Sequence, residues 1–186
     1  MKYVITALSL ALSTFLPITA EAQVASPNQN VWQSMREVVF DNPELPSTAS
    51  QEDRNLVQEI WGSELAARRT DERGPFPGYV LIGHVHQGPK QIVFSMYTTA
   101  GSDHCDPAAN GSGVTDIFVE CRMRVTTRPY TGLHKAELPS YCMIYAASET
   151  NSRVEYRYDT ATQTLHFRTI QFGKGVPVCT RALKLG

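Results

Sequence analysis

The chain lacks a large net charge, a paired-cysteine motif and a second long apolar run. Its formal net charge is −1 at pH 7, whereas a protein that binds nucleic acid without sequence preference is normally strongly basic. The cysteines include no C-x-x-C pair, which argues against a zinc knuckle or a thioredoxin-type redox site. Beyond the first apolar stretch, no run of about 20 apolar residues follows that could span a membrane. We therefore expect a soluble mature protein.

Motifs of nucleophilic catalysis are also missing. The chain has no G-x-S-x-G elbow, and Ser102, Asp103 and His104 are consecutive, whereas the members of a catalytic triad come together from separate parts of a fold. Cys105 follows His104 directly, but in an exported chain a disulfide explains this cysteine better than an activated thiolate. These absences favour a non-catalytic protein.

The first 22 residues have the three parts of a secretory signal peptide. Lys2 supplies a positive charge, residues 4–16 form an apolar stretch, and Ala20-Glu21-Ala22 matches the small-x-small pattern of cleavage sites. We predict a signal peptide over residues 1–22 and a mature chain, residues 23–186, that forms one domain. The mature protein is expected in the periplasm or outside the cell.

Export and an even number of cysteines together predict disulfide bonds. The mature chain contains four cysteines: Cys105, Cys121, Cys142 and Cys179. They predict two bonds, and the sequence does not choose among the three possible pairings.

Apolar spacing predicts two helices at the start of the mature chain. Between residues 31 and 39 apolar side chains recur at helical intervals, and Asp41-Asn42-Pro43 ends the pattern. A second apolar stripe runs over residues 51–69, where Ser50 and Asp53 form a capping-box pattern.

From Tyr79 onward the apolar period changes to two, which indicates strands. The runs with this pattern cover residues 79–87, 91–100, 117–125, 141–147, 153–159 and 164–172. Short, turn-prone connections favour an antiparallel meander. The sequence therefore predicts an α+β fold, in which two N-terminal helices pack on one face of an antiparallel sheet of about six strands and two disulfides hold the domain together.

Charged residues share a strand face on three of these runs, because side chains alternate along a strand. The three sets are Glu120, Arg122 and Arg124; Arg153, Glu155 and Arg157; and His166 and Arg168. If the three faces coincide, the outer side of the sheet carries an arginine-rich patch. The simpler interpretation is a solvated face with cross-strand ion pairs, each worth at most about 1 kcal/mol.

Two functions suit such a patch. Guanidinium groups recognise carboxylates bidentately, so the first hypothesis is a binding protein of inhibitor, immunity or envelope-accessory type that docks an acidic partner protein. Its binding residues are Arg122, Arg124, Arg153, Arg157 and Arg168.

The alternative is a secreted ribonuclease-like enzyme. In that hypothesis Glu120 takes the proton of the 2′-hydroxyl, His166 protonates the leaving oxygen and Arg122 stabilises the phosphorane.

His84 and His86 are the candidate metal ligands, because alternation places both imidazoles on one side of a strand. The following residues are Gln87-Gly88-Pro89-Lys90, so the glutamate that would complete such a site is missing. We expect neither a metal site here nor a cofactor elsewhere.

Overall fold

Strands dominate the computed structural model of the protein, which describes residues 30–41, 47–70, 77–99, 105–107, 118–129, 136–144 and 151–185. The single helix among these residues is α1 (Gln51–Arg69). The strands are β1 (Gln33–Ser34), β2 (Arg36–Phe40), β3 (Gly78–Gln87), β4 (Lys90–Thr99), β5 (Cys105–Pro107), β6 (Val119–Arg128), β7 (Ala136–Met143), β8 (Arg153–Asp159), β9 (Thr164–Gln171) and β10 (Lys174–Lys184).

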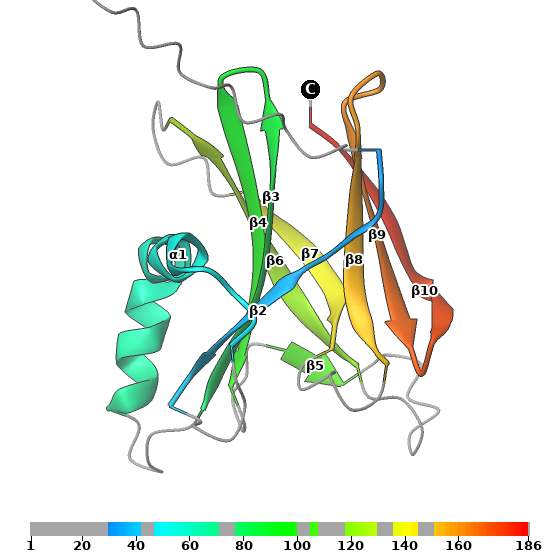
Figure 1. Ribbon diagram of the computed structural model, residues 1–186. Coiled ribbons are helices and arrows are strands. Elements are labelled where there is room, and N and C mark those ends of the chain that lie inside the picture. The colour runs from blue at the N-terminus through cyan, green and yellow to red at the C-terminus, as the bar shows by residue number, and fades with distance from the viewer. Residues whose placement is uncertain are drawn as a thin grey trace, which may run out of the picture.

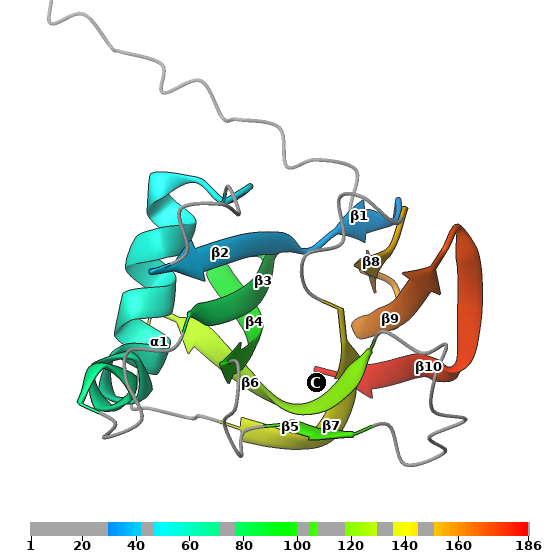
Figure 2. The ribbon, with the colours of Figure 1, turned by 90° about the horizontal axis from the view of Figure 1, so that it is seen from below.

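The strands form two antiparallel sheets that face each other. The four-stranded sheet has the order β1-β8-β9-β10, and the six-stranded sheet has the order β2-β3-β4-β6-β5, with β7 also paired to β6. Only Met35 separates β1 from β2, and its N–H donates to Val154 O at 2.8 Å. Figure 2 shows this blue segment running from one sheet into the other, so the N-terminal strands join the two sheets at one side.

The inner faces of the two sheets enclose the main core, which is rich in aromatic rings. Phe94 packs edge-on against Tyr156, with ring centroids 4.7 Å apart, and against Phe167, with centroids 5.2 Å apart. A Cβ atom on Gly83 would lie 2.3 Å from the Phe94 ring. Glycine at position 83 therefore lets β3 pass close to this ring.

Helix α1 covers the outer face of the six-stranded sheet, on the side away from β8, β9 and β10 (Figure 1). It begins with the predicted capping box, in which Asp53 N–H donates to Ser50 Oγ at 3.1 Å and Ser50 N–H donates to Asp53 Oδ2 at 3.1 Å. Its apolar stripe packs on side chains of β2, β3 and β4. The prediction of a helix over residues 51–69 is confirmed.

The predicted helix over residues 31–39 is wrong, because this segment forms β1 and β2. Val38 is buried beneath α1, whereas Val39 is buried in the core between the sheets. A strand buried on both faces carries apolar residues at consecutive positions, and this spacing also fits a helical pattern. The antiparallel pairing of β2 with β3 shows that this segment is a strand and not a helix.

The predicted α+β fold with two helices on one sheet is also wrong: the described chain is mostly strand, with one helix and two sheets. The hairpin of β3 and β4 and the strands β8 and β9 lie where the alternation predicts them. The sequence pattern missed β10, in which Gly175 and Pro177 interrupt the alternation. The register of β10 against β9 shifts between Val176 and Arg181.

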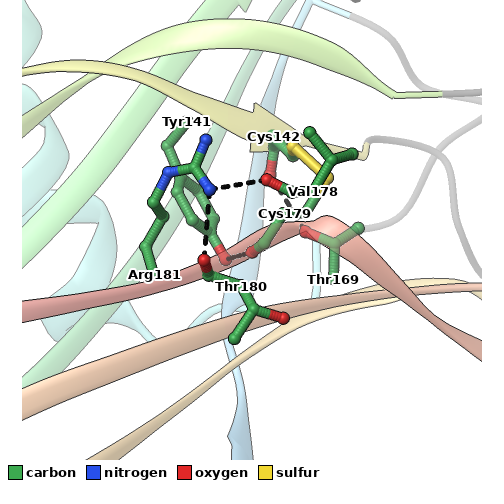
Figure 3. The surroundings of a disulfide bond; sticks show 7 residues. All are labelled: Tyr141, Cys142, Thr169, Val178, Cys179, Thr180 and Arg181. Carbon is green, nitrogen blue, oxygen red and sulfur yellow. Dashed lines mark hydrogen bonds between the residues drawn. A yellow bond between two sulfur atoms is a disulfide. The ribbon is translucent and has the colours of Figure 1, made fainter.

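Two disulfides are present, as predicted, and they have different places in the fold. Cys105–Cys121 joins directly paired residues of β5 and β6. Cys142–Cys179 instead joins β7 of one sheet to β10 of the other, and beside it Tyr141 donates a hydrogen bond to Cys179 O at 2.7 Å (Figure 3). This bond therefore links the sheets at the side opposite β1 and β2. Two disulfides indicate an oxidising environment.

The predicted signal peptide, residues 1–22, lies outside the described residues and stays a prediction. No helix in the described part of the chain is long and apolar enough to cross a membrane.

Candidate binding surface on the four-stranded sheet

Strands β8 and β9 bring two of the three predicted charged sets onto one face. Their register places Glu155 opposite Arg168 and Arg157 opposite His166. The alternate residues of both strands are buried in the core, so these four side chains and that of Arg153 share the outer face of the four-stranded sheet.

Glu155 lies at the centre of this face and holds two arginines. Its Oε1 accepts from Arg153 Nε and its Oε2 accepts from Arg168 Nε, each at 2.6 Å. The Glu155 side chain is 7% exposed, whereas those of Arg153 and Arg168 are 41% and 37% exposed. Both arginines are thus fixed through Nε, while much of each side chain remains open to solvent.

Trp32 also belongs to this face, although its spacing in the sequence predicts a helix. It directly precedes β1, which pairs with β8. Its ring lies beneath two guanidinium groups, with Arg168 Cζ 4.1 Å and Arg157 Cζ 5.3 Å from the ring centroid. The neighbouring Gln33 has the opposite orientation, because it accepts a hydrogen bond from the core residue Tyr156 at 3.0 Å. Only the register of β1 reveals this position of Trp32.

The result is an excess of positive charge, since the outer positions of β8 and β9 carry three arginines and two carboxylates, Glu155 and Asp159. Arg157 forms no ion pair with a described residue, and its buried Nε has no hydrogen-bond partner there. We call the set Trp32, Arg153, Glu155, Arg157, His166 and Arg168 the basic face.

The third predicted set lies elsewhere, because β6 belongs to the six-stranded sheet. Glu120 is partly buried and Arg122 is exposed on that strand. Because His166 is on β9 of the four-stranded sheet, neither residue shares a sheet with it. The residues of the ribonuclease hypothesis are therefore not brought together. The predicted binding residues divide in the same way, with Arg122 and Arg124 separated from the basic face.

Arg124 is covered by α1 and has a structural position. Its Nη1 donates to Ile60 O at 3.0 Å, its guanidinium lies 3.9 Å from the centroid of the Trp61 ring, and it forms an ion pair with Glu64. Burial acts to raise the pKa of Glu64, but hydrogen bonds from Arg124 and Ser63 outweigh it and hold this pKa below its ordinary value. Arg124 thus fastens the helix to the sheet.

The two candidate metal ligands lie at the other end of α1. His84 Nδ1 is 3.0 Å from Arg36 Nη2, and Arg36 also donates two hydrogen bonds to Asp53 at 2.6 and 2.7 Å. Because arginine is always a donor, Nδ1 accepts and the imidazole proton resides on Nε2. Burial, together with the nearby Arg36 charge, lowers the pKa of His84. The His84 imidazole therefore contributes to the contact between α1 and the sheet in its neutral form.

His86 is one of the residues that line a shallow groove of about 520 Å³; the others are Glu59, Pro89, Gln91, Arg128 and Pro129. No group of three or more His, Cys, Asp or Glu side chains that could hold a metal ion occurs among the described residues. The groove mixes one ion pair, Arg128 with Glu59, with proline rings, and we assign it no ligand.

Comparison of the chain with protein families, with curated proteins and with solved structures gives no match.

Proposed function

We propose that this is an exported, non-catalytic binding protein that works in the periplasm or outside the cell and docks an acidic partner protein on its basic face. The observation that carries the proposal is the unequal charge balance of the two sheets. Around α1 and the six-stranded sheet, Arg36, Arg124 and Arg128 each pair with a separate carboxylate, and Arg68 and Arg69 share Asp41. On the basic face, Arg153 and Arg168 share Glu155, and Arg157 forms no ion pair with a described residue.

The geometry of the basic face favours binding over catalysis. Glu155 already accepts from two arginines and is almost fully buried, so it is poorly placed to accept a proton from a substrate. The guanidinium groups instead lie on a rigid sheet and over an indole ring. Arginines held in this way lose little side-chain entropy when they bind a carboxylate.

Binding can be measured with a defined acidic probe, fluorescein-labelled octaglutamate, by fluorescence anisotropy at low ionic strength. Arg157→Gln is expected to weaken binding about tenfold, equivalent to about 1.4 kcal/mol. The matched control is Arg122→Gln, which removes the same charge from an exposed position on the six-stranded sheet. This control should change the affinity by no more than about twofold.

Two results contradict the proposal. One is the absence of saturable binding of octaglutamate to the folded protein. The other is an equal loss of affinity in Arg157→Gln and Arg122→Gln, since binding would then depend on net charge and not on the basic face.

A further inference from the structure

An exposed aromatic residue lies at the tip of the hairpin between β9 and β10. Phe172 is 52% exposed and has a φ of 50°, and the next residue, Gly173, has a φ of 76°. A bulky residue is disfavoured in the left-handed region, because its Cβ atom crowds the following carbonyl oxygen, and asparagine or glycine would form such a turn more easily. Strain of this kind in an exposed apolar residue points to a use outside the fold.

The tip is continuous with the basic face. Phe172 N–H donates to Ser152 Oγ at 2.9 Å, and Gly173 N–H donates to Asn151 O at 3.0 Å. The Asn151 side chain in turn accepts a hydrogen bond from Arg153 Nη1 at 3.1 Å. Backbone hydrogen bonds and one arginine thus fix the tip beside one end of the basic face.

This end of the face is also less polar than the rest. Ile170 lies opposite Arg153 on β8 and opposite Gly175 on β10. It has the same orientation as Arg168, two residues earlier on β9, because side chains alternate. Ile170 is only 8% exposed, so the apolar surface at this end is that of Phe172, in the turn that follows β9. From the tip to the level of Arg157 the face extends roughly 20 Å, at about 3.3 Å per residue.

We infer that the partner presents an extended, acidic segment with an apolar side chain at one end, which packs against Phe172 while carboxylates bind the arginines. The inference rests on the proposed function, whose partner it specifies further. Charge complementarity assigns the acidic part of the segment, and the exposed aromatic tip assigns the apolar end.

The test compares three labelled peptides of equal length: octaglutamate, six glutamates followed by two leucines, and two leucines followed by six glutamates. The variant is Phe172→Asn, which removes the ring and suits the left-handed turn, so the protein should fold at least as stably as the parent. One leucine peptide is expected to bind about five- to tenfold more tightly than octaglutamate. Phe172→Asn should abolish this gain and change octaglutamate binding by no more than about twofold.

The outcomes separate this inference from the proposed function. If octaglutamate binds through Arg157 but leucine adds nothing, or if Phe172→Asn weakens all three peptides equally, the inference is wrong and the proposed function stands. If no peptide binds, both are wrong. Vesicles of phosphatidylglycerol and phosphatidylcholine test a lipid surface as the occupant: vesicle binding that needs Phe172, without a leucine-dependent gain, would also overturn the inference.

Discussion

Each sheet places an arginine against a tryptophan and a glutamate, but only one of these clusters is covered. On the six-stranded sheet, Arg124 contacts Trp61 beneath α1 and its side chain is 14% exposed. On the four-stranded sheet, Arg168 contacts Trp32 and is 37% exposed, and it shares its carboxylate partner, Glu155, with another arginine. The same residue types thus form a helix attachment in one place and an open, positively charged surface in the other.

The difference shows that residue identity alone does not separate structure from function. A covered arginine must be paired, because an isolated buried charge is costly. An exposed arginine can keep its charge without a partner, since water solvates it. The two clusters therefore differ in whether a helix covers them and in whether each arginine has its own carboxylate partner.

The largest expected effect comes from removing the covered tryptophan, Trp61, and the contrast is with Trp32. Trp61 is 4% exposed and donates a hydrogen bond to Ser95 Oγ at 2.9 Å, so Trp61→Ala should reduce the free energy of unfolding by about 3 to 5 kcal/mol. Trp32→Ala on the open face should cost less than about 1 kcal/mol. Urea denaturation followed by circular dichroism measures both, and similar losses would contradict the distinction.

The disulfides test the joint between the two sheets. The Cys142–Cys179 bond closes a separation of 37 residues and the Cys105–Cys121 bond one of 16. By chain entropy, replacing the first pair with alanine should cost about 4 kcal/mol and replacing the second about 3 kcal/mol. Urea denaturation of the two double variants gives the comparison; a smaller loss for the Cys142–Cys179 pair would argue against its role in joining the sheets.

Substitution of Arg124 and of Arg157 should have opposite effects: the first lowers stability, whereas the second lowers binding. Arg124→Gln leaves Glu64 without its cation beneath α1, so we expect a loss of about 1 to 3 kcal/mol in the free energy of unfolding. Arg157→Gln should change this free energy by less than about 0.5 kcal/mol, although it weakens octaglutamate binding. The contrast fails if Arg157→Gln destabilises the fold as much as Arg124→Gln does.

The pH dependence of stability has the smallest expected effect. The pKa of His84 is lowered from its ordinary value of 6.5 by burial and by Arg36. The unfolded chain therefore binds this proton at a higher pH than the folded protein does, so the free energy of unfolding should decrease as the pH falls below about 6.5. Denaturation at pH 7 and pH 5 measures the decrease, and His84→Gln should make it smaller. An unchanged pH dependence in that variant would show that His84 does not contribute.

Local signals explain which parts of the fold the sequence predicts. Ser50 and Asp53 mark the start of α1 because a capping box needs only neighbouring residues. The alternation in β8 likewise places Glu155 and Arg157 on one face. The assignment of strands to sheets depends on distant pairing, which no local pattern contains. Arg122 and Arg124 were therefore grouped with residues of another sheet.

Trp32 shows the same limit for the candidate site. Its spacing from Met35 suits a helix, and only the pairing of β1 with β8 places its ring against Arg168. The alternation of charged residues in the sequence predicts an arginine-rich strand face. No pattern in the sequence predicts that α1 covers Arg124 and so removes it from that surface.

NMR of the arginine Nε–Hε groups during titration with octaglutamate tests most directly whether the basic face is the docking surface. We predict progressive, saturable shifts for Arg153, Arg157 and Arg168, because the acidic probe binds at these guanidinium groups. Arg36 and Arg124, which are paired beside α1, should keep their positions in the spectrum. Shifts confined to arginines of the six-stranded sheet, or small shifts spread evenly over all arginines, would contradict the assignment of the basic face as the docking surface.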